Sequence, residues 1–146
     1  MTKVEIAFDM DGVFLPDHAF IEGITEEEFF QRTLHEKPMF NPTYTFDVVT
    51  ARVESRRPVT EEWLKQLSKQ PKNLFMRPDE SETPAEFKFR IAVEQGYKIY
   101  VESDLQICKD MLKLIVKNEV DLRVIHFDSW VQQTFIRSFF EIDDWK

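Results

Sequence analysis

Two acidic residues, Asp9 and Asp11, stand two positions apart in the segment FDMDGV, directly after an apolar run at residues 4–8. The run is typical of a buried strand, and ligands of open parallel sheets bind just beyond the carboxyl ends of the strands. One carboxylate placed there can attack a phosphorus atom, and the other can protonate the oxygen that leaves. A calcium loop starting at Asp9 would need oxygen ligands where Val13 and Phe20 stand, which excludes an EF-hand. A solvated turn without function is the alternative that the motif alone leaves open.

Four further polar residues follow later predicted strands. Thr50 in VVTAR ends the second strand, Lys88 in EFKFR lies in the first turns of the helix after the third, and Glu102 and Asp104 in YVESD end the fourth. Alone, each has an ordinary explanation as a turn former, a solvated charge or a helix-start signal. Their order along the chain, however, predicts that folding gathers them with the two acids at one edge of the sheet. A lysine and a hydroxyl could hold a transferring phosphoryl group, and magnesium held by carboxylates and the substrate phosphate could neutralise its charge.

The elements that must position these residues alternate along the chain. Short β-rich runs at residues 4–8, 44–49, 73–76, 98–101 and 122–127 predict five strands. The helices predicted between them are one that is capped by Thr25 and ends before Pro38, then 61–70 capped by Thr60, 83–95 and 105–118. Strands that alternate with such helices are typical of crossover units, so we expect an α/β fold with a mainly parallel sheet. No linker or repeat divides the sequence, which predicts a single domain over residues 1–146.

With these motifs in this order, nearly the whole chain resembles the haloacid dehalogenase-like phosphatase superfamily. The resemblance rests on DMDGV, VVTAR, the following Lys88 and the acidic end of the fourth predicted strand. It implies a Rossmann-like fold with a five-stranded core, Asp9 as the nucleophile and Asp11 as the general acid and base. It also implies that Thr50 and Lys88 hold the phosphoryl group. Magnesium would be bound by the Asp9 carboxylate, the Asp11 backbone carbonyl and an acid of the fourth motif.

The fourth motif departs from the pattern of the family, which usually has an Asp pair or a Gly-Asp pair at this place. Here the sequence reads Glu102-Ser103-Asp104. By register Glu102 is the first acid and Ser103 takes the second place, with Asp104 as the fallback ligand. Glu102 and Asp104 therefore stay alternatives for the acid that completes a magnesium site.

A finer similarity links VVTARVESRRPVTEEWL and LFMRPDESETPAEFK to the 3′-phosphatase domain of polynucleotide kinase and its small phage relatives. It implies that Arg52 and Arg77 contact the substrate phosphate or the edge of the site. Ion pairs with Asp79, Glu80 or Glu82 are the structural alternative for these arginines. The expected substrate is therefore a nucleotide or polynucleotide phosphate. A sugar phosphate or other small metabolite is the alternative substrate, and an inactive binding domain of the same fold is the alternative function.

The loops around the predicted site are short. Residues 14–42, at the first place where the family inserts a cap domain, have room for one helix and a flap, and residues 78–87, at the second place, have room for neither. We therefore expect an open site without a full cap domain. His18 lies in the flap region, where it is expected at the surface. The aromatic tail predicts a final helix packed on the sheet or, alternatively, a face through which the chain forms a homo-oligomer; the residues at helical spacing are Phe127, Val131, Phe135 and Phe139.

Composition and charge exclude several other classes of protein. The 146 residues carry a net charge of −8, which disfavours broad binding of a nucleic-acid backbone. The three glycines lie too far apart for a GxGxxG turn or a P-loop, and the single Cys108 excludes an internal disulfide and a four-cysteine zinc site. No signal peptide is expected, and no apolar run approaches the ~18 residues of a membrane helix, so the predicted compartment is the reducing cytoplasm.

Overall fold

Five parallel strands form one sheet in the computed structural model, which describes residues 3–15 and 24–128. In chain order the strands are β1 (Ile6–Phe8), β2 (Asp47–Val53), β3 (Leu74–Arg77), β4 (Ile99–Glu102) and β5 (Arg123–His126). Their order across the sheet is β3-β2-β1-β4-β5, and every neighbouring pair is parallel. The strand order changes direction between β1 and β4, which is where doubly wound sheets bind ligands. The α/β class and the parallel sheet predicted from the sequence are confirmed.

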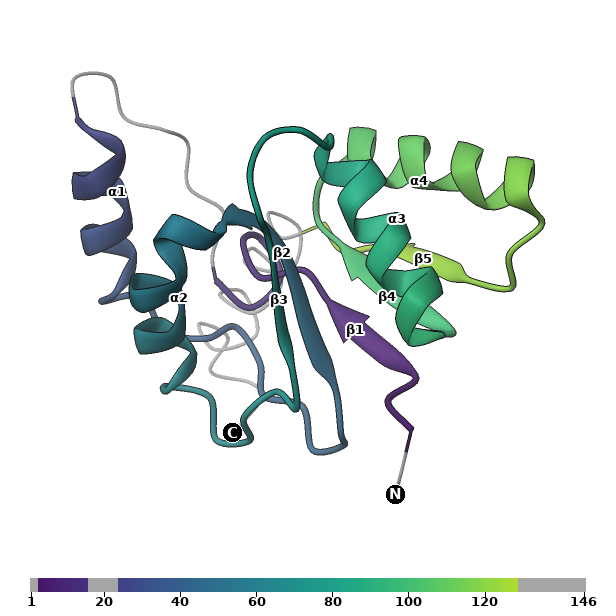
Figure 1. Cartoon of the computed structure of the whole chain (residues 1–146). Coiled ribbons are helices and arrows are strands. Elements are labelled where there is room, and N and C mark those ends of the chain that lie inside the picture. Colours follow the sequence, from purple (N-terminus) through teal and green to yellow (C-terminus); the bar gives the residue numbers. More distant parts are fainter. Residues whose placement is uncertain (1–2, 16–23, 129–146) are drawn as a thin grey trace, which may run out of the picture.

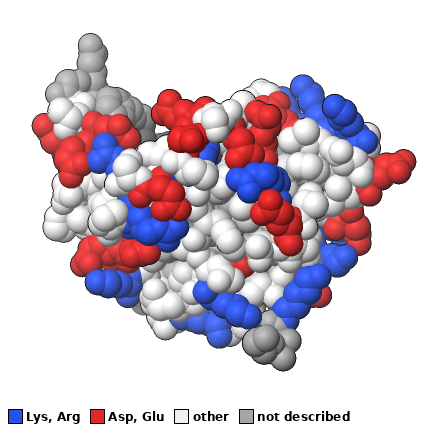
Figure 2. Space-filling model, in the orientation of Figure 1, with Lys and Arg blue, Asp and Glu red and all other residues white. Residues whose placement is uncertain are grey.

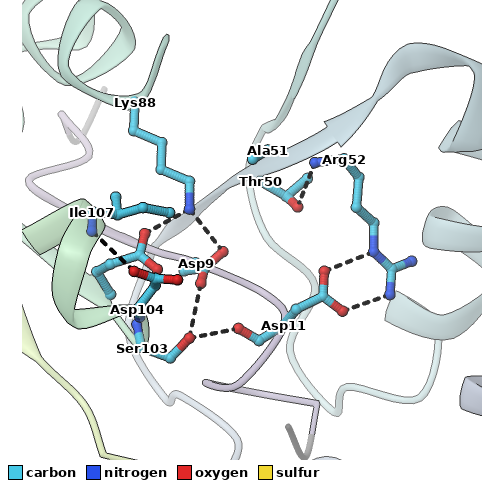
Figure 3. A pocket seen from close by; sticks show the side chains of 10 residues that line it. Asp9, Asp11, Thr50, Ala51, Arg52, Lys88, Ser103, Asp104 and Ile107 are labelled. Carbon is cyan, nitrogen blue, oxygen red and sulfur yellow. Dashed lines mark hydrogen bonds and ion pairs between the residues drawn. The ribbon is translucent and has the colours of Figure 1, made fainter. Parts of the chain in front are cut away.

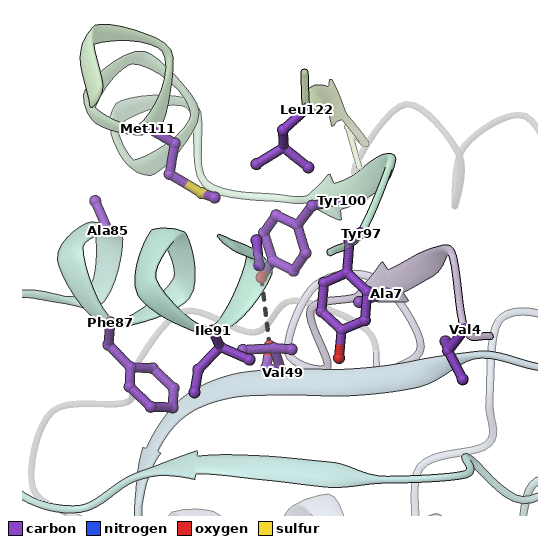
Figure 4. Close-up of a cluster of buried hydrophobic side chains, with 11 residues drawn as sticks. Val4, Ala7, Val49, Ala85, Phe87, Ile91, Tyr97, Tyr100, Met111 and Leu122 are labelled. Carbon is purple, nitrogen blue, oxygen red and sulfur yellow. Dashed lines mark hydrogen bonds between the residues drawn. The ribbon is translucent and has the colours of Figure 1, made fainter. Parts of the chain in front are cut away.

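Helices cover both faces of this sheet (Figure 1). They are α1 (Glu26–Thr33), α2 (Arg57–Leu64), α3 (Pro84–Gln95) and α4 (Leu105–Asn118). Helices α3 and α4 lie together on one face, and α1 and α2 lie on the other. Successive strand residues point to opposite faces, so Ala7 and Tyr100 enter the core under α3 and α4, whereas Phe8 and Val101 enter the core on the α2 side. Figure 4 shows the first of these two cores.

The ends of α3 follow the signals in its sequence. Thr83 caps its N-terminus and, with Glu86, forms the reciprocal hydrogen bonds of a capping box. Pro84 takes the first helical position, and Gly96 follows the last with a φ of 71°, a left-handed conformation that favours glycine. Helix α1 also begins as predicted after Thr25, whose hydroxyl accepts a backbone N–H of the first turn.

The second helix begins earlier than the sequence predicts. Instead of residues 61–70, α2 spans Arg57–Leu64 and follows a 3₁₀ turn at Glu54–Arg56. Pro58 lies in its first turn, where the missing N–H removes no helical hydrogen bond. The prediction that Thr60 caps this helix is wrong, because Thr60 lies inside it and donates its hydroxyl to the carbonyl four residues back.

Strand β2 begins and ends later than predicted, because it spans Asp47–Val53 rather than residues 44–49. Its pairing with β3 continues across an irregularity between Thr50 and Val53, so Thr50 lies within the strand and not at its end. The other strand bounds differ from their predictions by one or two residues. His18 and residues 129–146 of the predicted aromatic helix lie outside the described residues, whereas Phe127 is described and lies after β5 outside any helix.

Charged side chains of both signs lie on the face of the molecule seen in Figure 2, and the single cysteine is buried. On this face the described acidic and basic side chains are interspersed. Cys108 is buried in α4, and burial together with the nearby Glu102 raises the pKa of its thiol to about 11, as expected for a structural cysteine. No helix within the described ranges is long and apolar enough to cross a membrane.

A buried carboxylate holds the amino end of β2, at the opposite edge of the sheet from the predicted site. Asp47 is 1% exposed, and its Oδ1 accepts hydrogen bonds from the backbone N–H and the side-chain amide of Asn73 at 3.0 and 3.1 Å. Its Oδ2 accepts the hydroxyl of Tyr97 at 2.5 Å. Burial and this neighbouring carboxylate raise the pKa of Tyr97. The three bonds join β2 to the segments that lead into β3 and β4.

Tyr97→Phe removes one donor from the buried Asp47 carboxylate, so it should lower the free energy of unfolding by about 2 kcal/mol. Urea unfolding measures this change. Tyr44→Phe is the matched control, since Tyr44 is 50% exposed, and it should cost less than about 0.5 kcal/mol. Equal losses in the two variants would show that the hydroxyl bond to Asp47 does not stabilise the fold.

Candidate active site

A pocket opens at the carboxyl ends of β1, β2 and β4, where the sheet topology predicts a ligand crevice (Figure 3). Its volume is about 230 Å³. The residues that line it are Asp9, Asp11, Thr50, Ala51, Arg52, Lys88, Glu102, Ser103, Asp104 and Ile107. The structure thus brings together every residue predicted for the site except Arg77.

The floor of the pocket is a buried ion group formed by Asp9, Lys88 and Glu102, which are 5%, 2% and 0% exposed. The Lys88 ammonium donates to Asp9 Oδ1 at 3.2 Å and to Glu102 Oε1 at 2.5 Å. Asp9 follows β1, Glu102 ends β4, and Lys88 comes from the second turn of α3. Three elements therefore have to be in place before the ion group can form.

Both acids of the fourth motif already have structural partners. Glu102 Oε1 accepts the Tyr100 hydroxyl at 2.9 Å in addition to Lys88, and Oε2 accepts the backbone N–H groups of Ser103 and Asp104, both at 3.1 Å. Asp104 caps α4, because its Oδ1 accepts the backbone N–H three residues on. Glu102 is therefore placed to hold the lysine, and Asp104 to start the helix.

The three charges of the ion group set one another's protonation. Burial raises the pKa of Asp9 well above its usual range; Lys88 opposes this shift, and Glu102 and Asp11 add to it. Burial also disfavours ionised Glu102, but the charge of Lys88 and the hydrogen bonds from Lys88, Asp9 and the Asp104 backbone together outweigh it and lower the Glu102 pKa. Burial opposes the charge on Lys88 too, yet the two carboxylates raise its pKa. Asp9 is thus the acid that most readily holds a proton, and added positive charge beside it would favour its ionised form.

Asp11 lies at the mouth of the pocket and faces Arg52 (Figure 3). Arg52 Nε donates to Asp11 Oδ2 at 2.8 Å and Nη2 donates to Oδ1 at 2.7 Å, which makes a bidentate ion pair. The Arg52 side chain is 4% exposed, whereas that of Asp11 is 41% exposed. The sequence indicates that Arg52 belongs to the site but not that it pairs with Asp11, because 41 residues separate the two side chains and no local pattern connects them.

Thr50 and Arg77 are placed differently with respect to the pocket. Thr50 is 1% exposed, lines the pocket, and accepts the backbone N–H of Arg52 through its hydroxyl at 3.2 Å. Arg77 does not line the pocket; its guanidinium donates to the backbone carbonyl of the residue after Thr50 and to that of Glu82, both at 3.0 Å. The Glu82 carboxylate pairs with Arg90 instead. Arg77 is therefore anchored on backbone carbonyls at the edge of the site.

Ser103 is a residue of the site whose contacts the sequence did not reveal, although its place in the fourth motif was noted. Its hydroxyl donates to the backbone carbonyl of Asp11 at 2.8 Å and lies 3.3 Å from Asp9 Oδ2. No three His, Cys, Asp or Glu side chains among the described residues are grouped so that they could hold a metal ion. A cation in this pocket would therefore need the backbone carbonyl and the serine hydroxyl as ligands beside the Asp9 carboxylate.

No family model, curated protein or solved structure was found to match this chain. The chemistry of the pocket is therefore inferred from the contacts of its residues. They place a buried carboxylate, a buried ammonium, a hydroxyl and a second carboxylate around one opening at the carboxyl edge of the sheet. Such a set is suited to the transfer of a negatively charged group.

Lys88→Met should leave two buried carboxylates without their counter-ion and lower the free energy of unfolding by roughly 3–5 kcal/mol at neutral pH. Without the ammonium, the folded-state pKa of Asp9, which is already raised, should rise further, and that of Glu102 should rise from below to above its value in the unfolded chain. Stability is then lost as the pH rises through the folded-state values, so the deficit should be larger at pH 8 than at pH 5.

Urea unfolding at the two pH values measures the deficit of Lys88→Met. Lys113→Met is the matched control, because Lys113 is exposed on α4 and its replacement should change stability by less than about 0.5 kcal/mol. A deficit in Lys88→Met that is small, or that does not change between pH 5 and pH 8, would contradict the account of the ion group.

Proposed function

We propose that this chain is a magnesium-dependent phosphomonoesterase that works through an aspartyl-phosphate on Asp9. The observation that carries the proposal is the pairing of two unlike carboxylates in one pocket. Asp9 is buried against Lys88, and Asp11 lies two residues on at the open mouth. A buried carboxylate with a fixed cation suits a nucleophile, and an accessible carboxylate suits a group that exchanges protons with leaving oxygens and water.

In the proposed reaction, an Asp9 oxygen attacks the phosphorus atom while the bond from phosphorus to the leaving oxygen breaks. Asp11 gives its proton to that oxygen, so the alcohol leaves neutral. Asp11, now a carboxylate, takes a proton from a water molecule, whose oxygen attacks the phosphorus and releases Asp9 and inorganic phosphate. Lys88 and the Thr50 hydroxyl would hold the non-bridging oxygens through both steps.

The charge of the pocket supports a requirement for a divalent cation. The lining residues include four acids against two bases, and a phosphate ester would add further negative charge. The oxygen atoms of the Asp9 carboxylate, the Asp11 backbone carbonyl and the Ser103 hydroxyl converge, and magnesium prefers oxygen ligands completed by water and substrate phosphate. These three residues fit magnesium, with Ser103 where the resemblance implies an acid. When bound, the ion would offset the charge on the phosphate and favour ionised Asp9.

A nucleotide or polynucleotide phosphate remains the proposed class of substrate, and a small phosphorylated metabolite its alternative. The guanidinium groups that suggested it, those of Arg52 and Arg77, are bonded within the protein. A panel of phosphate esters with magnesium separates the two classes. It should include p-nitrophenyl phosphate, sugar phosphates, nucleotides, and 3′- and 5′-phosphorylated oligonucleotides.

Asp9→Asn should lower the turnover of every hydrolysed ester by roughly a thousandfold or more, because it removes the attacking oxygen. Circular dichroism should confirm that the variant is folded. Asp121→Asn is the matched control, since Asp121 lies at the amino edge of the sheet with a side chain that is 87% exposed, and it should keep wild-type rates. Substantial hydrolysis by Asp9→Asn would contradict the covalent mechanism.

Ser103→Asp should strengthen magnesium binding by about tenfold or more, because it adds a second carboxylate beside Asp9 and the Asp11 carbonyl. Isothermal titration calorimetry of the protein with magnesium, without substrate, measures the dissociation constant. Ser103→Asn, which has the same shape without the charge, should bring no such gain. An unchanged dissociation constant in Ser103→Asp would place the cation elsewhere.

A further inference from the structure

We propose that Arg52 is a positioning residue that holds the general acid Asp11, and that helix α1 holds Arg52 through the ring of Phe30. The proposal rests on the proposed function, and it replaces the expected contact between Arg52 and substrate phosphate. Three side chains from separate parts of the chain then form one relay, from Phe30 on α1 through Arg52 on β2 to Asp11 after β1.

Each nitrogen atom of the Arg52 guanidinium donates a hydrogen bond within the protein. Nε and Nη2 donate to the two oxygens of Asp11, and Nη1 donates to the Thr60 hydroxyl at 3.1 Å. With 4% of the side chain exposed, a substrate phosphate could engage this group only by displacing Asp11. Arg52 is therefore built into the protein as a support and not presented as a free anion-binding group.

The bidentate contact fixes Asp11 without using all of its capacity. A carboxylate has about four lone-pair sites, and the fork of Arg52 takes two of them. The Asp11 side chain is still 41% exposed, so its remaining sites are open to a leaving oxygen or a water molecule. The plane of the carboxylate is set by Arg52, and proton transfer depends on that orientation.

The ring of Phe30, on helix α1, packs against the face of the Arg52 guanidinium. The central carbon of Arg52 lies 4.6 Å from the centroid of the Phe30 ring, and that of Arg56 lies 5.0 Å from the same centroid. Arg56 also pairs with Glu26 and Glu27 at the start of α1. The helix is thus docked on the segment that carries both arginines, and the position of the ring limits where Arg52 and its partner Asp11 can lie.

The kinetic test uses Arg52→Lys, which keeps the charge and loses the fork, and Phe30→Leu, which keeps the apolar contact and loses the ring. If Arg52 positions the acid, Arg52→Lys should lower kcat by about tenfold or more for an alkyl phosphate, whose leaving oxygen needs a proton. It should lower kcat by less than about threefold for p-nitrophenyl phosphate, and leave KM for both esters within about twofold. Phe30→Leu should show the same pattern with a smaller loss.

Two comparisons decide the role of Arg52. In the Asp11→Asn background, Arg52→Lys should have no further effect. As a matched control, the single variant Arg90→Lys, on the surface of α3, should match wild type. A higher KM for both esters, or losses that add to those of Asp11→Asn, would overturn the proposal and assign Arg52 to the substrate phosphate. Unchanged kinetics in Phe30→Leu would show that α1 does not position Arg52.

The phosphatase proposal fails if wild type and Asp9→Asn hydrolyse esters equally, or if no ester is hydrolysed. A second measurement still tests the contact between Arg52 and Asp11 in that case. Urea unfolding of Asp11→Ala, Arg52→Ala and the double variant needs no substrate. The double variant should unfold at the same urea concentration as Arg52→Ala alone, because Arg52→Ala already removes the partner of the Asp11 carboxylate. Shifts of the midpoint that add would contradict the relay.

Discussion

The buried charge of Lys88 is the interaction on which the rest of the site depends. Asp9 and Glu102 come from the ends of neighbouring strands β1 and β4, and two carboxylates at such buried positions repel each other. The ammonium between them compensates both, and Tyr100 and two backbone N–H groups hold Glu102 in place around it. The position of Lys88 depends in turn on where α3 begins, so the capping box at Thr83 bears on the geometry of the pocket.

The two acids of the FDMDGV motif have separate basic partners. Asp9 points inward to Lys88, which comes from the α3 side of the sheet, and Asp11 points outward to Arg52 on β2. One acid is buried and the other half-exposed, although only one residue separates them. This difference in surroundings is the physical basis for giving them the different roles of nucleophile and proton carrier in the proposed reaction.

The sequence predicted those parts of the structure that depend on local patterns. Alternating apolar runs and helix signals led to the parallel α/β sheet. The carboxyl ends of parallel strands brought Asp9, Thr50 and Glu102 to one pocket, which Lys88 joins from α3. The predicted start of α2 was wrong because it relied on Thr60 as a cap and did not use Pro58, which fits the first helical turn.

The contacts that could not be predicted join residues that are distant in the chain. The pairing of Arg52 with Asp11 and that of Tyr97 with Asp47, 50 residues apart, depend on the assembled layers and leave no periodic trace in the sequence. Ser103 was visible as a departure from the family pattern, but its hydroxyl bond to the Asp11 carbonyl requires the β1 and β4 loops to be side by side. The sequence therefore predicted which residues lie in the site, whereas the contacts among them could be seen only in the structure.

The most direct test of the central claim is to trap the phosphorylated carboxylate. The protein is quenched during turnover of a phosphate ester with magnesium and treated with borohydride, which reduces an acyl phosphate of aspartate to homoserine, and peptides are then sequenced by mass spectrometry. Homoserine is expected at position 9 and at no other aspartate. Turnover without homoserine at position 9, or with homoserine at Asp11 instead, would contradict the central claim.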